Sequence, residues 1–262
     1  MQGFSHSGNF GDIIYSLPFC LSVMKHKKIT KANFNLQINV QAKYAPGLKH
    51  PCGSVRMTQA VAEMIKPLLE IQPYIGEVTI SETIPEDYYN LDDFRKLNIK
   101  WESGSITQWY YPLMLEILNL YPTDKPWLVS TEDVDCNDKI VVFRSDRYQR
   151  KEVNLSSLKK YKDDIIFLGL PQEHATFQRD VCECYYSPID NFLQALNIIG
   201  SSKLVVGNQT GLFSLAEAIN KDRCLETSFE CPNVVMSGGR YFSIISEQQL
   251  ETTLDEIINK RN

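Results

Sequence analysis

Residues 204–218, LVVGNQTGLFSLAEA, decide the fold class of this chain. Leu204–Val206 is a short apolar run that predicts a buried strand, and Leu212–Asn220 carries apolar residues at helical spacing. The glycines, amides and threonine between these segments predict a tight turn. A buried strand that runs through such a turn directly into a helix is the repeating unit of a parallel α/β sheet.

The same alternation of apolar runs and helical patterns extends through the second half of the chain. Six strands are predicted there, at Ile140–Phe143, Ile165–Leu168, Val181–Tyr185, Leu204–Val206, Cys224–Glu226 and Val234–Met236. Crossover helices are predicted near Leu155–Tyr161, Gln172–Gln178, Ile189–Ile199 and Leu212–Asn220, and a closing helix over Glu247–Lys260. Five or six strand–helix units within about 100 residues form a complete Rossmann-like domain.

The first half is less regular, but its pattern is also α/β. Its predicted elements are a helix over Ile13–Met24, a strand over residues 33–40, a helix at Thr58–Ile71, a strand at Val78–Ser81 and a helix at Ile106–Leu120. Pro18 removes one backbone donor and is expected to kink the first of these helices.

The segment Pro122–Asp138 predicts a domain boundary, because it holds two prolines and five acids without clear periodicity. We therefore expect two Rossmann-like domains, over residues 1–130 and 131–262. They are expected to face each other across a cleft near this segment, with the closing helix packed across or beside the boundary.

Composition argues against several classes of function. A net charge of −5 and a pI near 5.5 supply no broad positive field for nucleic acid. No apolar run approaches the roughly 18 residues of a membrane span, so we expect no stable membrane insertion and a cytoplasmic location. Seven cysteines without a C-x-x-C pair, together with four scattered histidines, favour reduced thiols over a metal site.

The turn Ser7-Gly8-Asn9-Phe10-Gly11-Asp12 is the first candidate ligand site. Its glycines and the free backbone N–H groups of a helix start allow a ligand to approach closely, so Gly8, Asn9 and Gly11 are predicted contacts. Asp12 has two interpretations. Its carboxylate either caps the helix or serves as a functional group at the carboxyl edge of a parallel sheet, where α/β folds bind ligands.

A second candidate site follows the strand Ile140–Phe143. Arg144, Ser145 and Arg147 place two guanidinium groups and a hydroxyl at the strand end. Guanidinium groups bind phosphate through paired, charge-assisted hydrogen bonds, so this loop predicts an anion site. The alternative is a surface loop whose charges compensate each other.

The turn within residues 204–218 is the third candidate site. Its predicted contacts are Asn208, Gln209, Thr210, Gly211 and Leu212. Backbone N–H groups and a hydroxyl at the positive end of a helix dipole suit a diphosphate. The alternative is a plain capped turn, because asparagine, threonine and glycine are common at such junctions.

Two further strand ends complete the candidates. Gly169 and Leu170 follow one predicted strand, and Glu226 ends another, which we expect to be its neighbour. They are predicted to supply a pocket for a base and a carboxylate for ribose hydroxyls. Taken singly, each is also compatible with an ordinary loop.

Taken in order, these segments resemble the bacterial heptosyltransferase-like glycosyltransferases of family 9, whose two-domain architecture is called GT-B. The Gly11-Asp12 turn with the following Ile13-Ile14-Tyr15-Ser16-Leu17-Pro18 is similar to that family's N-terminal signature. Residues 207–218 are similar to its phosphate-binding turn and helix, and the 144–147 loop falls where the family contacts the donor phosphates. Asn208 departs from the family pattern, since members usually carry aspartate there.

The resemblance implies an inverting, metal-independent glycosyltransferase without a cofactor, in which Asp12 acts as the catalytic base. It implies that the C-terminal domain binds a nucleotide-sugar donor and that the N-terminal domain faces the acceptor. The acceptor class stays open among a glycan, a lipid-linked sugar and a modified nucleic acid.

Three other functions stay open at this point. Asp133-Val134-Asp135 fits the Asp-x-Asp motif of metal-dependent transferases with the GT-A fold, although it lies in the acidic linker. A non-catalytic nucleotide or sugar-nucleotide binding module would use the same phosphate turn, with Asp12 as a cap only. A sugar-nucleotide epimerase built on the same architecture would need no acceptor.

Overall fold

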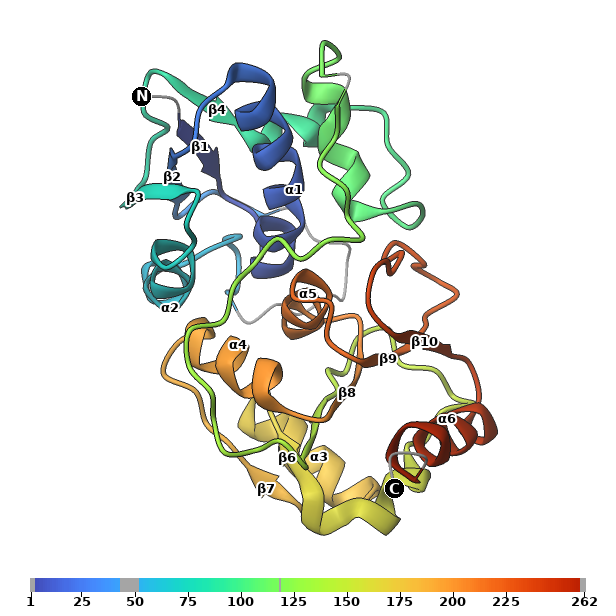
Figure 1. Ribbon diagram of the computed structural model, residues 1–262. Coiled ribbons are helices and arrows are strands. Elements are labelled where there is room, and N and C mark those ends of the chain that lie inside the picture. The colour runs from blue at the N-terminus through green and yellow to red at the C-terminus, as the bar shows by residue number, and fades with distance from the viewer. Residues whose placement is uncertain (1–2, 43–51, 118, 260–262) are drawn as a thin grey trace.

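The computed structural model describes residues 3–42, 52–117 and 119–259. Within these ranges the chain forms two parallel sheets, one in each half, with helices packed around them (Figure 1). The predicted class, two α/β halves with parallel sheets, is confirmed.

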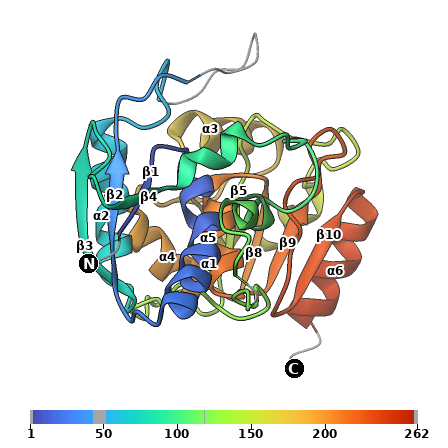
Figure 2. The same ribbon diagram turned by 90° about the horizontal axis from the view of Figure 1, so that it is seen from above.

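The N-terminal sheet has the strand order β3-β2-β1-β4, with every pairing parallel. Its elements are β1 (Gly3–His6), α1 (Phe10–Lys27), β2 (Ala32–Gln37), α2 (Gln59–Glu70), β3 (Ile75–Ser81), β4 (Tyr88–Asn90) and the 3-10 helices η1 (Leu91–Lys96) and η2 (Ile106–Leu113). Helix α1 packs against η2 beside the sheet (Figure 2). The strand order reverses between β1 and β4, so the carboxyl ends of these two strands form a switch point, where open α/β sheets bind ligands.

The C-terminal sheet has the order β10-β9-β8-β5-β6-β7, again fully parallel. Its elements are β5 (Ile140–Phe143), η3 (Ser156–Asp164), β6 (Ile165–Phe167), α3 (Pro171–Asp180), β7 (Tyr185–Tyr186), α4 (Phe192–Ser201), β8 (Leu204–Asn208), α5 (Gly211–Ala218), β9 (Arg223–Glu226), β10 (Tyr241–Ile244) and α6 (Glu247–Asn259). Numbered from β5, this is the 3-2-1-4-5-6 order of the Rossmann fold, read in reverse. Its switch point lies between β5 and β8.

Three predicted elements differ from the observed ones. Residues 234–236 form no strand, because they belong to a loop that reaches the N-terminal half, and β10 is the sixth strand instead. The strand predicted at Val181–Tyr185 shortens to β7. The helix predicted over Ile106–Leu120 ends as a 3-10 helix just after Pro112, which cannot donate a backbone hydrogen bond. Leu118, within that prediction, and Lys260 lie outside the described residues.

Helix α6 packs within its own half of the molecule. Its buried stripe of Leu250, Leu254 and Ile257 joins a core between η3 and the C-terminal sheet. The carboxylate of Glu247 accepts hydrogen bonds from backbone N–H groups near the start of η3, including that of Ser157 at 2.7 Å. Figure 1 shows α6 at the side of the lower sheet, away from the linker. The prediction that the closing helix lies across or beside the domain boundary is therefore wrong.

One apolar core runs through both halves and holds them together. The rings of Phe10 and Phe192 stack across the junction, with their centroids 3.7 Å apart. Trp127 in the linker is buried, and its indole donates to the carbonyl of Ile14 at 3.1 Å while its backbone N–H donates to that of Ala218 at 2.8 Å. The linker is therefore tied to α1 above and to α5 below.

Candidate active site

The two switch points face each other where α1 and α5 begin. A Cβ atom on Gly11 would lie 3.5 Å from the Cα atom of Gly211, and one on Gly211 would lie 2.8 Å from a ring carbon of Phe10. The missing side chains therefore let the two helix starts touch, a packing role that sequence reasoning missed. That Gly11 and Gly211 also contact a ligand stays a prediction.

Asp12 is the third residue of α1, and Asn9 is the N-cap. The carboxylate pairs with Arg95, whose Nη2 donates to Oδ2 at 2.7 Å. The other oxygen, Oδ1, makes no hydrogen bond to the described residues, and the side chain is 20% exposed. The interpretation of Asp12 as a helix cap is therefore wrong, and its carboxylate faces the switch point with one oxygen open.

Asp92 anchors the guanidinium of Arg95. Its Oδ1 accepts from Arg95 Nε at 3.0 Å and from Arg56 Nη1 at 3.1 Å, while Oδ2 accepts from the backbone N–H of Ser7 at 2.5 Å. Burial alone would raise the pKa of Asp92, but electrostatic interactions with His6 and Arg95 and the hydrogen bonds from Ser7 lower it to about 2. Asp92 is therefore ionised at neutral pH and holds Arg95 in place.

Sequence reasoning missed both Asp92 and Arg95. They follow β4, a strand of three residues without a clear apolar pattern, so nothing local in the sequence marked a strand end there. Their spacing of three residues on η1 was the only available signal.

His6 fixes the turn that carries Asp12. Its Nδ1 accepts from the backbone N–H of Gly8 at 2.7 Å, which assigns the ring proton to Nε2. Nε2 then donates to the hydroxyl of Tyr110 at 2.9 Å, and that hydroxyl donates to the carbonyl of Asp12 at 2.9 Å. Burial lowers the pKa of His6, so the ring is neutral with both nitrogens engaged. A side chain on Gly8 would clash with the imidazole ring, which explains that glycine.

The loop after β5 is held in place by Asn208. Its buried side chain accepts from the backbone N–H of Ser145 at 3.0 Å and donates to the carbonyls of Ser145 and Arg147 at 2.9 and 2.6 Å. The half-buried guanidinium of Arg147 lies near the ring of Tyr148 and makes no ion pair within the described ranges. Asn208 thus shapes the loop, and Arg147 has its charge available for an anion.

Arg144 and Glu226 form a buried ion pair with each other. Arg144 Nε and Nη2 donate to the two carboxylate oxygens at 2.8 and 2.7 Å, and the Glu226 side chain is only 2% exposed. The pair engages both charges with each other, and the binding of phosphate by Arg144 and of ribose by Glu226 stays a prediction.

The turn before α5 keeps backbone donors available. Thr210 is the N-cap, and its hydroxyl accepts from the backbone N–H of Phe213 at 3.3 Å. The N–H groups of Gly211 and Leu212, in the first helical turn, have no hydrogen-bond partner among the described residues. The turn is therefore capped and also presents two donors at the positive end of the helix dipole.

A loop of the C-terminal half closes one end of this site. Gln209 hydrogen-bonds to the side chain of Asn233, which donates to the carbonyl of Trp101 at 2.7 Å. The backbone N–H of Ile106 donates to the carbonyl of Asn233 at 3.1 Å. Gln209 is thus engaged in joining the turn before α5 to the N-terminal half.

Gly169 and Leu170 lie on the other side of the C-terminal switch point from Glu226. The strands β5 and β8 separate β6 from β9, so the prediction that these residues end neighbouring strands is wrong. At about 4.8 Å per strand, the two strand ends are about 14 Å apart. Gly169 accepts a hydrogen bond from the hydroxyl of Tyr186 at 3.1 Å, and Leu170 is partly exposed as the N-cap of α3.

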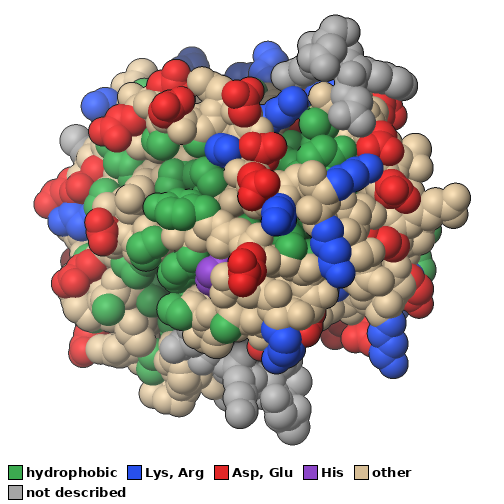
Figure 3. Space-filling model, turned by 90° about the horizontal axis from the view of Figure 1, so that it is seen from below, with side chains coloured by type: hydrophobic (Ala, Val, Ile, Leu, Met, Phe, Trp, Pro, Cys, Tyr) green, Lys and Arg blue, Asp and Glu red, His purple; other side chains and the backbone are tan. Residues whose placement is uncertain are grey.

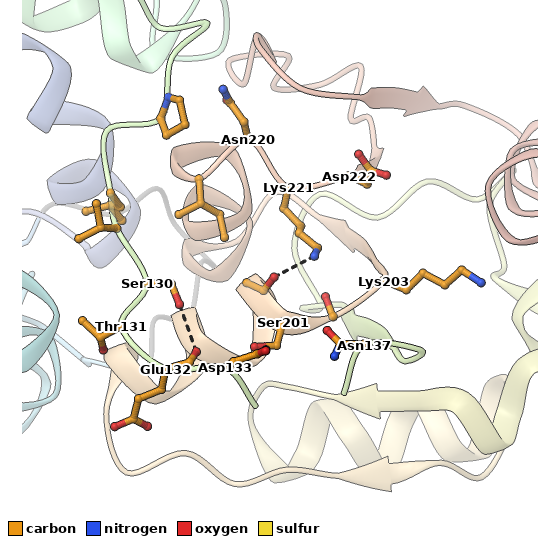
Figure 4. A pocket seen from close by; sticks show the side chains of 16 residues that line it. Ser130, Thr131, Glu132, Asp133, Asn137, Ser201, Lys203, Asn220, Lys221 and Asp222 are labelled. Carbon is orange, nitrogen blue, oxygen red and sulfur yellow. Dashed lines mark hydrogen bonds between the residues drawn. The ribbon is translucent and has the colours of Figure 1, made fainter. Parts of the chain in front are cut away.

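One hollow lies at the opposite edge of the C-terminal sheet. It has a volume of about 990 Å³ and is bounded by the linker and by the turns before β8 and β9 (Figure 4). Asp133 lines it, far from the carboxyl ends of the strands. Within the described residues, no three His, Cys, Asp or Glu side chains are grouped so that they could hold a metal.

The second hollow, of about 490 Å³, lies beside the edge strand β7 and is lined in part by Tyr185, Ile166 and Leu193. Figure 3 shows the molecule from below, where hydrophobic side chains gather in one area of the surface. Asp12 lines neither hollow.

Comparisons with known proteins rest on structure alone. No protein-family model and no curated protein sequence matches the chain. A family 9 glycosyl transferase from Veillonella parvula DSM 2008 superposes with a TM-score of 0.66 at 10% identity, over 99% of this chain and 97% of that one. E. coli heptosyltransferase WaaC with ADP superposes with a TM-score of 0.64 at 10% identity, over 98% of this chain and 99% of that one. E. coli ADP-heptose lps heptosyltransferase II superposes with a TM-score of 0.60 at 13% identity, over 99% of each chain.

The chain has the GT-B fold. The sequence resemblance to heptosyltransferase-like proteins is thus confirmed at the level of fold. In this GT-B fold, Asp12 belongs to the N-terminal half and the turn before α5 to the C-terminal half. Among the helices of the described ranges, none has the length and apolar character needed to cross a membrane.

Proposed function

We propose that this chain is an inverting, metal-independent glycosyltransferase that uses a nucleotide-sugar donor. The position of Asp12 carries the proposal. Its carboxylate has one oxygen without a hydrogen bond to the described residues and lies at the N-terminal switch point. There the start of α1 contacts the turn before α5, which belongs to the C-terminal switch point. A base in one half and a phosphate site in the other, where the two halves meet, suit the transfer of a sugar from a nucleotide to a hydroxyl. The ADP in the WaaC structure, a neighbour in fold, is consistent with a nucleotide here.

In this proposal the donor diphosphate binds at the start of α5. The N–H groups of Gly211 and Leu212 and the guanidinium of Arg147 supply hydrogen bonds to its oxygens. They also stabilise the negative charge that develops on the leaving diphosphate, because they are already oriented before the reaction.

In this proposal the acceptor hydroxyl binds against the N-terminal half. Asp12 Oδ1 removes its proton as the acceptor oxygen attacks the anomeric carbon from the face opposite the diphosphate. The new C–O bond forms while the bond to the diphosphate breaks, so the configuration inverts. Arg95 keeps Oδ2 occupied and thereby directs Oδ1 toward the cleft.

The proposal assigns residues 1–130 to an acceptor-side domain and residues 131–262 to a donor-side domain. A glycan, a lipid-linked sugar and a modified nucleic acid stay candidate acceptors, and a cytoplasmic location stays a prediction. The motif at Asp133 loses support as a metal site for the donor, because it lies at the amino-terminal edge of the sheet.

A thermal-shift screen of ADP-, UDP- and GDP-linked sugars tests the proposal, because a ligand that binds only the folded state raises its apparent stability. We expect at least one of them to raise the melting temperature and then to be hydrolysed or transferred. Binding without turnover would identify a sugar-nucleotide binding module, and conversion of the free donor to its epimer would identify an epimerase. Failure of every sugar nucleotide to bind would overturn the proposal.

A further inference from the structure

Tyr148 has a backbone conformation that aromatic residues rarely adopt. Its φ is +58°, in the left-handed region, where glycine and asparagine are common and a bulky side chain is strained. Of the other described non-glycine residues with positive φ, two are asparagines and Lys28 ends helix α1, which are usual settings, whereas Leu155, directly before η3, is a second exception. Tyr148 belongs to neither setting, and strain of this kind is often found at functional sites.

Hydrogen bonds on both sides of Tyr148 hold this conformation. The side chain of Asn208 donates to the carbonyl of Arg147 at 2.6 Å, directly before Tyr148. Two residues further on, the backbone N–H of Arg150 donates to Glu226 Oε1 at 2.5 Å. Asn208 and Glu226 are buried at the ends of β8 and β9, so the rigid sheet imposes the strained conformation.

The Tyr148 side chain is within electrostatic range of groups from both halves of the molecule, Cys231 and Asp12. The side chain of Tyr148 lies near the buried thiol of Cys231, so the two groups affect each other. Burial raises the pKa of Tyr148, and the charge of Asp12 adds to this, so the hydroxyl is protonated and close enough to the carboxylate to be affected by it. A thiol sulfur is a weak acceptor, so a sugar hydroxyl can replace it readily.

We propose that Tyr148 binds the transferred sugar of the donor by donating a hydrogen bond from its hydroxyl to a sugar hydroxyl. The proposal rests on the function proposed above, in which Arg147 holds the diphosphate and Asp12 receives the acceptor proton. The sugar must lie between these two groups, and Tyr148 follows Arg147 directly in the chain. Its role is to bind and orient the sugar, and no covalent bond to Tyr148 forms.

The test compares ligands with and without the sugar. Tyr148→Phe keeps the ring and the backbone conformation but removes the hydroxyl. Calorimetry with ADP-glucose, UDP-glucose and GDP-mannose, and with the free nucleoside diphosphates, measures each affinity. We expect Tyr148→Phe to weaken binding of the sugar nucleotide by about 2- to 12-fold and to leave the nucleoside diphosphate unchanged.

Tyr161→Phe is the matched control. The Tyr161 hydroxyl donates to Asp255 on α6 at 3.2 Å, away from the cleft, so this variant should bind both ligand types like the wild type. Tyr148→Gly is a second variant, because glycine adopts the same φ without strain and the chain should still fold. It is expected to lose the sugar contact as well.

Two results would overturn the role of Tyr148. One is an unchanged affinity of Tyr148→Phe or Tyr148→Gly for a sugar nucleotide that the wild type binds. The other is an equal loss of affinity for the sugar nucleotide and the nucleoside diphosphate, which would mean that the sugar is not what Tyr148 contacts. If the wild-type chain binds none of these probes, that result overturns the proposed function together with the inference that rests on it.

Discussion

Asp12 Oδ2 and Arg95 Nη2 lie 2.7 Å apart, although 83 residues separate them in the chain. Asp12 follows β1 and Arg95 follows β4, so the ion pair joins the two strands whose ends form the N-terminal switch point. The pair fixes which carboxylate oxygen is left without a hydrogen bond to the described residues.

Asp12→Asn should remove the base while keeping the size of the side chain. We expect kcat for sugar transfer to fall roughly 10²- to 10⁴-fold with donor affinity largely intact. The measurement is steady-state transfer with a donor found by the binding screen, beside calorimetric binding of the same donor. Asp93→Asn, at a half-exposed site that pairs only with Asn90 and Lys96, is the control. Near-normal transfer by Asp12→Asn would remove Asp12 from the mechanism.

The lowered pKa of Asp92 predicts how the stability of the fold depends on pH. The pKa of Asp92 is about 2 in the folded chain, below its ordinary value of 3.8, so its ionised form stabilises the fold above pH 4. This contribution, about 2 kcal/mol, should be lost as the pH falls from 4 to 2. Urea denaturation across this range should show a shallower loss for Asp92→Asn than for the wild type. Identical pH slopes for the two chains would contradict the assignment.

The two arginines after β5 should respond differently to truncation. Arg147→Ala is expected to weaken donor binding by about 1.5–3 kcal/mol, roughly ten- to a hundredfold, because it removes a charged hydrogen bond to phosphate. Arg144→Ala leaves Glu226 buried without its partner, so it should lower the free energy of unfolding by about 3–5 kcal/mol.

Calorimetry and chemical denaturation of both arginine variants separate the two effects. An Arg144→Ala variant as stable as the wild type would contradict the stabilising role of the Arg144 ion pair. An Arg147→Ala variant that binds the donor normally would contradict the binding of phosphate by Arg147.

Gly211→Ala tests the contact between the two helix starts. The new methyl group would lie 2.8 Å from a ring carbon of Phe10, so we expect a destabilisation of about 1–3 kcal/mol from overpacking. Combining it with Phe10→Leu should recover part of that loss in a double-mutant cycle, because the smaller side chain makes room. Additive effects of the two substitutions would show that the helix starts are not packed as described.

Local patterns in the sequence predicted much of the C-terminal half. The apolar strands and their crossover helices repeat with clear periods, and β5, β8 and β9 appear where the pattern placed them. The turn at Thr210 was identified for the same reason, since small and polar residues between a strand and a helix are a local signal. β4 and β10 were missed, because they are edge strands whose residues are mostly half-buried or exposed, so neither carries the continuous apolar run of a buried strand.

The sequence by itself determined the fold class, because hydrophobic periodicity and turn chemistry are properties of neighbouring residues. It also placed Asp12 and Arg147 at strand ends. Only the tertiary structure decided how charges pair: Arg95 with Asp12, and Arg144 with Glu226 82 residues away. An ion pair depends on which strand ends the sheet order brings together, and that order follows from packing across the whole chain.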